Sequence, residues 1–356
     1  MIPLIRNSLS TLQMSLVSRR SVERTTADLQ RTSQEVSTGR KADLYADMGS
    51  KSAFVLALED RASSNSHFIT SNKLLGSKLE MISSGAASAR GAAQDVLGLA
   101  LANLEHSSST ASTLQQQARA ALDTIMTSLN ISLDGDHLFS GVASDRPALR
   151  GYDSVNSATG LSPQDVISGI VGSGPADGTQ ATSMLAQIDS VFDETNADPA
   201  KRFSTTFFQG DTPSTPAPRK TALIGDGETL QYGMQADDPE FRSIIKGLTL
   251  LASVDVSKIQ DQNAYKSWMA AGVGALSDGV EGLRNSETAL GAKQKRLDVK
   301  LTQQQSMDAV LNSRLSDYVS VDPYEAATRM TALQTQLNAS YSVAAQMSKL
   351  SILNYL

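Results

Sequence analysis

Apolar residues recur with helical spacing along both halves of the chain. Between residues 75 and 100 the gaps alternate strictly between four and three residues. The positions are Leu75, Leu79, Ile82, Ala86, Ala89, Ala93, Val96 and Ala100. This 3.5-residue repeat is typical of helices packed as coiled coils, and the alanines permit close approach. After a polar break at 106–109, a shorter stretch repeats the pattern at Ala111, Leu114, Ala118, Ile125 and Leu129.

The longest repeat lies towards the C-terminal end. One register runs from Leu276 to Tyr318, and nine of its thirteen positions are apolar. No proline occurs between residues 240 and 322, so the pattern predicts one helix of ~60 residues, about 90 Å long at 1.5 Å per residue. Such a helix needs antiparallel partners of similar length. The polar exceptions in the register are Glu287, Gln294, Gln304 and Asp308.

The N-terminal segment has a weaker amphipathic pattern. Its stripe consists of Ile5, Leu9, Leu12 and Leu16, then Val22, Leu29 and Val36, with Thr26 and Ser33 at the intermediate positions. Ser37-Thr38-Gly39 ends the predicted helix. Helix stability in proteins comes mainly from packing of the apolar face, so this helix would be marginal alone.

A final helix is predicted to begin at Asp322-Pro323. Asp322 suits the N-cap, Pro323 suits the first helical position, and Glu325 can complete a capping box. One side of this helix carries Met330, Leu333, Leu337, Tyr341, Ala344, Met347, Leu350 and Leu353. Neither terminal stripe has a large local domain to cover it, so both are expected to be buried in a neighbouring subunit. The predicted assembly interface is Ile5, Leu9, Leu12, Leu16, Leu333, Leu337, Tyr341, Ala344, Met347, Leu350 and Leu353.

The middle of the chain differs from both ends. Eight of the ten prolines fall between Pro147 and Pro239. A hairpin is predicted at 221–232 around Gly225-Asp226-Gly227, a short strand at 137–139, and helix or turn starts at Ser162-Pro163 and Asp198-Pro199. The expected fold is mainly α: a long antiparallel coiled-coil rod formed by the N- and C-terminal segments, with a small mixed α/β, β-rich domain inserted at its tip. Three parts are expected. Residues 1–41 with 320–356 form a terminal helical assembly domain, residues 42–134 with 251–319 form the helical rod, and residues 135–250 form the inserted outer domain.

Composition narrows the possible functions. The net charge of −6 argues against a broad nucleic-acid interface, and the absence of cysteine removes disulfides, thiolate metal sites and Cys nucleophiles. No segment has the ~20 apolar residues needed to span a bilayer, so membrane insertion is not expected. The first seven residues also lack a cleavable secretory signal.

Candidate chemistry is sparse. The three histidines, His67, His106 and His137, show no metal-ligand spacing, and solvated or capping roles are expected. Asp134-Gly135-Asp136 lacks the further ligands of a calcium loop and predicts a turn, and Gly172-Ser173-Gly174-Pro175 lacks the ending of a phosphate loop. Basic residues from Arg19 to Lys41 are interleaved with acids, which favours a solvated or interfacial helix face. We therefore expect no enzyme activity, no cofactor and no metal.

Four motifs carry a resemblance to the bacterial flagellin family. Val36-Ser37-Thr38-Gly39-Arg40-Lys41 resembles a family turn, and Leu138-Phe139-Ser140-Gly141 resembles a family strand. Tyr232-Gly233 followed by Ala236-Asp237, and the ending 348–356, also match. The resemblance covers roughly 1–140 and 240–356, and it implies a structural component of the bacterial flagellum. It also implies terminal segments 1–36 and 322–356 that are poorly ordered in the monomer and order on assembly.

Within this family, the start 1–7 and the ending 353–356 depart from flagellin and are more similar to hook–filament junction proteins of the hook-associated protein 3 type. The resemblance implies type III export to the extracellular flagellum without a cleaved signal. It implies as partners other copies of the chain, flagellin, another hook-associated protein and a cytoplasmic export chaperone. Flagellin itself is the alternative. Two competitors come from other classes: an unrelated exported coiled-coil effector or needle-tip protein, and an enzyme or ligand-binding activity in the inserted domain.

Overall fold

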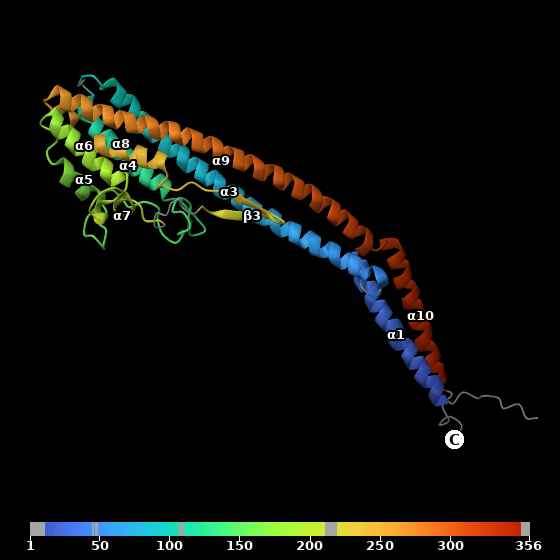
Figure 1. Cartoon of the computed structure of the whole chain (residues 1–356). Helices are drawn as coiled ribbons and strands as arrows, with labels where there is room; N and C mark the ends of the chain where they lie inside the picture. Colours follow the sequence, from blue (N-terminus) through green and yellow to red (C-terminus); the bar gives the residue numbers. More distant parts are fainter. Residues whose placement is uncertain (1–10, 45, 47–48, 107–109, 211–218, 350–356) are drawn as a thin grey trace, which may run out of the picture. The chain divides into compact units, whose positions relative to one another are not determined.

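The computed structural model describes residues 11–44, 46, 49–106, 110–210 and 219–349 (Figure 1). The chain divides into two compact units, one of residues 1–67 with 304–356 and the other of residues 68–303. In the described residues the structure is mostly helical, with two small antiparallel sheets. This confirms the predicted mainly α class with long helices at both ends of the chain. The three-part division at residues 41, 134, 250 and 319 stays a prediction.

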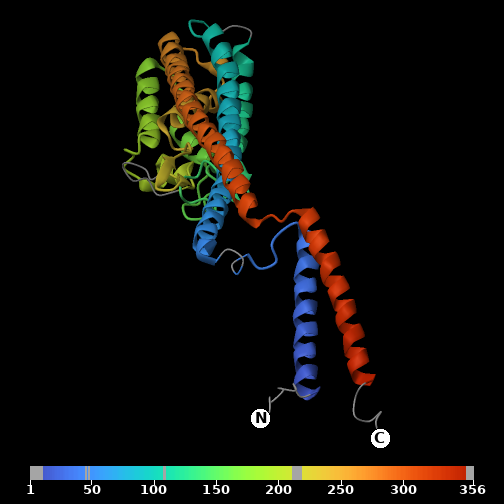
Figure 2. The ribbon, with the colours of Figure 1, turned by 90° about the vertical axis from the view of Figure 1, so that its right-hand side faces the viewer.

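The first unit contains two helices from opposite ends of the chain, α1 (Thr11–Thr38) and α10 (Pro323–Lys349), which lie side by side (Figure 2). α10 begins where predicted, because an Asp322 carboxylate oxygen accepts the Tyr324 N–H at 2.8 Å and Pro323 follows Asp322. Glu325, expected to reach back to Asp322, instead binds Arg329 one turn further along, with 2.8 Å between Oε1 and Nη2. The unit also contains the short 3₁₀ helix η1 (Gly49–Lys51).

Two long helices contribute to both units, α3 (Ser52–Ala102) and α9 (Gln262–Val319). α9 has 58 residues, which confirms the predicted long helix. All eight apolar positions of the 75–100 repeat are buried, and so are the five positions of the shorter repeat in α4 (Ala111–Leu129). The polar position Glu287 of the α9 register is matched by Arg90 of α3, whose Nε lies 3.0 and 3.1 Å from the two carboxylate oxygens. The heptad faces read from the sequence are therefore the packed faces.

α8 (Pro239–Ser253) packs closely against α9 in the second unit. A Cβ added to Gly279 of α9 would lie 2.5 Å from Ile244 Cγ1 and 2.8 Å from the Glu240 carbonyl oxygen, so only glycine permits this approach. Trp268, which is fully buried, donates its indole N–H to the Leu250 carbonyl at 3.1 Å. The 3₁₀ helix η3 (Val256–Lys258) separates α8 from α9.

The middle of the chain is more helical than its prolines and glycines suggested. It contains α5 (Pro163–Val171), α6 (Gly178–Phe192), η2 (Pro199–Lys201) and α7 (Phe203–Thr206). The predicted starts at Ser162-Pro163 and Asp198-Pro199 are confirmed, the first with a complete capping box to Asp165. In the described part of this region, strands are confined to two hairpins, so the expected β-rich character is limited to them there.

Both hairpins turn at an Asp-Gly pair. In the first, β1 (Ser132–Leu133) pairs with β2 (Asp136–His137), and Asp134 and Gly135 have φ of 53° and 87°, as a two-residue hairpin turn requires. The predicted strand at 137–139 is thus shorter and begins one residue earlier. The second hairpin, β3 (Thr221–Gly225) with β4 (Glu228–Gln231), lies where the sequence placed it.

Candidate assembly interface

On the α1 side, the contact between α1 and α10 combines two aliphatic residues with two threonines and a glutamate. Val22, Thr25, Leu29, Thr32 and Glu35 follow helical spacing on the face turned inward, and Thr25 is only 4% exposed. The Thr25 hydroxyl donates to the Ser21 carbonyl at 2.9 Å, which satisfies it without a partner on α10. Little apolar area is removed from water along this face, so the pairing of the two helices contributes modestly to stability.

The inward face of α10 is apolar but also narrow. It runs through Ala326, Met330, Leu333, Leu337 and Ala344, of which only Ala326 is fully buried. The remaining four are half-buried. The leucines therefore still expose part of their surface in the single chain, and a further partner could cover it.

A short turn ties the inner ends of the two helices together within the first unit. Gly39 has φ +68°, and the Lys41 N–H donates to the Val319 carbonyl at 2.9 Å while the Val321 N–H donates to the Gly39 carbonyl at 3.0 Å. Buried Glu35 accepts the Ala42 N–H at 3.3 Å. The 36–41 motif is thus the segment that joins α1 to the start of α10.

The outward faces of both helices expose large apolar side chains. Leu16, Val17 and Val36 are exposed on α1, and Tyr341 and Val343 are 54% and 51% exposed on α10. α10 also has no charged residue from 330 to 348. A helix face that stays in water normally carries charges, whereas the centre of a protein interface is depleted of them. Tyr341 and Val343 are about 200° apart around the helix, so this outward face comprises both exposed flanks of α10. It has the composition of a buried interface.

Exposed aromatic residues gather near the junction of α9 and α10 in the first unit. Phe54 is half-exposed and packs edge-on against Tyr318, with 5.7 Å between ring centroids. Tyr324, in the first turn of α10, is 87% exposed. Aromatic residues make up only 5% of the chain, so their exposure here marks a second candidate contact surface.

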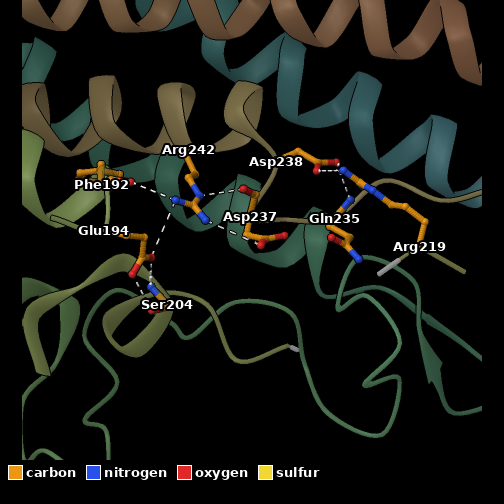
Figure 3. A network of polar contacts seen from close by, with 8 residues as sticks. All are labelled: Phe192, Glu194, Ser204, Arg219, Gln235, Asp237, Asp238 and Arg242. Atoms are coloured by element: carbon orange, nitrogen blue, oxygen red, sulfur yellow. Dashed lines mark hydrogen bonds and ion pairs between the residues drawn. The ribbon is translucent and has the colours of Figure 1, made fainter. Parts of the chain in front are cut away.

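A separate polar network holds the second unit together around α8 (Figure 3). Asp237 points towards Arg242, and Asp238 points towards Arg219. Arg219 donates to both carboxylate oxygens of Asp238, one at 2.9 Å, and Asp238 also accepts the Gln235 N–H at 2.8 Å. The hydrogen bond to Asp238 raises the pKa of Arg219.

Arg242 connects α8 to the loop that follows α6. Its guanidinium donates to the carbonyl oxygens of Asp237 and Phe192 at 2.7 and 3.2 Å and lies over the Phe203 ring, 5.1 Å from the centroid. Glu194, at a φ of +60°, is 3.8 Å from the same guanidinium and accepts both the N–H and the hydroxyl of Ser204. Apart from one carboxylate oxygen of Asp237, the charged groups of this network pair with one another or with nearby backbone groups, which makes the network structural.

Two of the sequence motifs meet beside this network. The Ala236 N–H donates to the Phe139 carbonyl at 2.9 Å, and the Phe139 ring packs edge-on against Phe241 with 5.8 Å between centroids. Residues about a hundred positions apart therefore form one packed junction.

Chemical sites are not evident in the described part of the chain. No group of three His, Asp or Glu side chains there could hold a metal ion, and none of the helices there is long and apolar enough to cross a membrane. His137 contacts the Asn130 carbonyl through Nδ1 at 3.1 Å, and Asp136 binds Lys78, which lowers the pKa of that carboxyl. Asp134-Gly135 forms a hairpin turn, as expected.

Two family models match the ends of the chain. The bacterial flagellin N-terminal helical region matches residues 9–144, and the bacterial flagellin C-terminal helical region matches residues 273–356, together more than half of the chain. The chain belongs to the bacterial flagellin family. It is a flagellar structural protein of that family, and the two matched regions contain the whole of α1 and of α10.

A solved structure assigned as a flagellar hook-associated protein from Vibrio parahaemolyticus has a similar fold. The TM-score is 0.52, the sequence identity is 14%, and the likeness covers 76% of this chain and 99% of that one. At this identity the likeness shows a shared fold alone. No curated protein matches the sequence.

The structure places some of the assembly residues predicted for this flagellin-family chain. Leu16 and Tyr341 are exposed, and Leu333, Leu337 and Ala344 are half-buried. Leu12 and Met347 lie in α1 and α10, but their side chains fall outside the described residues, as do Ile5, Leu9, Leu350 and Leu353 altogether. These eleven positions stay a prediction as an assembly interface.

Both stripes differ from the predicted ones at their intermediate positions. Thr25 and Thr32, rather than Thr26 and Ser33, are buried on α1. On α10 Ser340 is half-buried and Tyr341 is exposed, and Val343 is exposed on the opposite side of the helix. The prediction also missed Val343 and the charge-free run around it, although the run can be counted directly in the sequence.

Proposed function

We propose that this flagellin-family chain is a hook–filament junction protein. It polymerises through its terminal helices and connects the hook to the flagellin filament. Its partners are other copies of itself, flagellin on the filament side and another hook-associated protein on the hook side. A cytoplasmic chaperone holds the chain before export, and the exported protein has no enzymatic role.

The observation that carries the proposal is the outward face of α10. Tyr341 and Val343 are half-exposed in a run of nineteen residues, 330–348, without a single charge. Burying the exposed half of each side chain is favourable by about 1 kcal/mol, and no buried charge opposes it. Copies that stack along their terminal helices gain this free energy, while a single chain does not.

The charge distribution is consistent with the same assembly. Residues 1–67 with 304–356 contain 12 basic and 11 acidic residues, whereas residues 68–303 contain 19 basic and 26 acidic residues. The nearly neutral unit can pack against copies of itself without net repulsion, whereas contacts made by the acidic unit need local pairing of opposite charges. We therefore assign the main polymer contacts to α1 and α10.

Two features favour the junction role over that of the filament subunit. The start 1–7 and the ending 353–356 depart from the termini of flagellin. The neighbour of similar fold is assigned as a hook-associated protein. We place the protein in the extracellular flagellum, exported through the flagellar type III channel without a cleaved signal. The absence of cysteine suits a chain that crosses that channel unfolded.

The test is a deletion strain whose surface is imaged and whose spent medium is assayed for flagellin. The junction role predicts bare hooks together with abundant soluble flagellin, because filament subunits are exported but cannot attach. Bare hooks or thinned filaments without leaked flagellin would instead identify the chain as a filament subunit. Normal filaments would contradict both roles.

A further inference from the structure

The second unit contains a cavity that its polar network does not fill. The cavity has a volume of about 310 Å³ and lies between the end of hairpin β3–β4, the first turn of α8 and the middle of α9. Its walls combine apolar groups, such as buried Met234 and Leu290, with the ring of Tyr232 and several charged side chains. A concave site with an apolar floor and a few polar groups is typical of a binding pocket.

Three of the four charged side chains that line the cavity are already satisfied. Arg219 is held by both oxygens of Asp238. Glu240 accepts the Ser286 hydroxyl and lies in the first turn of α8, where the helix dipole stabilises a negative charge. Lys293 is the exception, because it has no acidic side chain within 4 Å among the described residues.

The surroundings of Lys293 are locally basic within an acidic unit. Between residues 293 and 300, α9 carries four basic residues and one acidic residue. Arg296 and Lys300 both bind Glu228 of β4, at 2.8 and 2.7 Å, so one carboxylate faces two cations. The cavity therefore lies beside a positive stretch. Its own lining carries two cations, Arg219 and Lys293, and two anions, Asp238 and Glu240, so Lys293 is the charge that remains to pair with an entering negative group.

We propose that this cavity receives an acidic side chain from a neighbouring copy of the chain, whose carboxylate pairs with the Lys293 ammonium. The inference rests on the proposed assembly of copies into a flagellar structure. The methylene groups of an aspartate or glutamate would lie against Met234 and Leu290, while the carboxylate reaches Lys293. The second unit of the neighbouring copy can supply the acidic side chain, because it has 26 acidic residues against 19 basic ones.

The pocket itself can be tested on the free chain, whatever its role in the flagellum. The full-length protein with ¹³C-methyl methionine is titrated with N-acetyl-glutamate amide, and the Met234 methyl signal, assigned with Met234→Leu, reports occupancy. We expect a saturable shift of Met234 that the neutral N-acetyl-glutamine amide does not reproduce. Lys293→Met should weaken binding about tenfold or more, the effect of losing one charged hydrogen bond, whereas the matched variant Lys295→Met should not. An unmoved Met234 signal, or equal shifts in both variants, would overturn the pocket.

The neighbouring copy as source of the carboxylate is tested by carbodiimide cross-linking, which joins an amine to a carboxylate in direct contact. Flagella sheared from cells are compared with the purified monomer. We expect a Lys293 link to an aspartate or glutamate of this same chain that forms in flagella and not in the monomer. A Lys293 link to a different protein, or inter-chain links that omit Lys293, would overturn the inference. Flagella that contain none of the chain would contradict the proposed function itself, while the titration result would stand.

Discussion

Asp237 and Asp238 are adjacent in the sequence but have opposite electrostatic environments. Asp238 accepts two hydrogen bonds from Arg219, whereas one carboxylate oxygen of Asp237 is buried without a hydrogen-bond partner among the described residues. Burial, and then the neighbouring charge of Asp238, raise the pKa of Asp237 above its ordinary value. The same residue type therefore opposes folding at one position and supports it at the next.

We expect Asp237→Asn to raise the free energy of unfolding at pH 7, on the order of 1 kcal/mol for one unpaired buried polar group. In the unfolded chain an aspartate has a pKa of about 3.9, so above the raised folded value the ionised Asp237 costs stability. That cost disappears as the pH falls through the folded pKa, and the advantage of the variant should vanish towards pH 4. Urea unfolding at several pH values measures it.

Asp238→Asn is the matched variant and should behave in the opposite way. It removes the charge that Arg219 binds at two points, and hydrogen bonds to charged groups contribute about 1.5–3 kcal/mol. Its free energy of unfolding should fall at pH 7. If both variants destabilise the chain equally, the environment described for Asp237 is wrong.

The packing of α8 against α9 depends on glycine at one position and tolerates alanine at another on the same helix. At Gly279 a Cβ would lie 2.5 Å from Ile244 Cγ1, and at Gly274 nothing lies within 4 Å of it. We expect Gly279→Ala to destabilise the second unit by about 1–3 kcal/mol through overpacking. Gly274→Ala should stabilise it by about 0.5–1 kcal/mol, because alanine is the better helix former. Thermal unfolding of the two variants measures both; equal effects would contradict this contact.

Sequence patterns predicted the long helices well because their signal is periodic and extends over many turns. The buried positions of α3, α4 and α9 follow the 3.5-residue repeats that can be read from the chain. In the single chain Thr25 and Ser340, rather than the expected Thr26 and Tyr341, turn inward between the apolar positions. Positions 22 and 29, or 337 and 344, belong to two possible frames. Which frame faces inward depends on how the partner helix docks, and a straight helix also drifts from a 3.5 repeat.

Contacts between distant segments carry no comparable signal in a single sequence. The network of Arg219, Asp238, Arg242 and Glu194 joins residues up to 48 positions apart, and the cavity beside Lys293 needs β4, α8 and α9 at once. Motif resemblance found Ala236-Asp237 and Phe139-Ser140-Gly141 but not that they meet. The charge-free run of α10, in contrast, could have been found from the sequence by counting charged residues.

At the scale of the whole molecule, the two units differ in how much apolar surface they bury. The α1–α10 contact buries Thr25, Thr32 and Ala326 with half-buried leucines, whereas the second unit has a large aliphatic and aromatic core. Local unfolding starts where few apolar contacts hold a segment. If residues 1–36 and 322–356 order fully only on assembly, these segments should be less protected from proteolysis than the second unit in the free chain.

Limited trypsin digestion of the monomer tests this difference on matched sites. Arg24 and Arg31 of α1 and Lys295 and Arg296 of α9 are all exposed side chains on helices. We expect cleavage in α1 to be faster by about tenfold or more, because helix opening rather than side-chain access limits it. The appearance of the fragments is followed by mass spectrometry. Equal cleavage rates would show that the terminal pair is as stable as the second unit in the free chain.

The outward face of α10 gives the sharpest prediction for assembly. Val343 is half-exposed in the single chain, so Val343→Glu should leave the helix content and thermal unfolding of the monomer almost unchanged. In a polymer that buries this face, an unpaired carboxylate would cost several kcal/mol. We therefore expect the variant to fail to restore filaments and swimming to the deletion strain, although it is exported. Val343→Gln is the control, because an uncharged polar residue matches Gln334, Gln336 and Gln346 on the same helix and should restore both. Full filaments with Val343→Glu would mean that this face stays in water in the assembled flagellum.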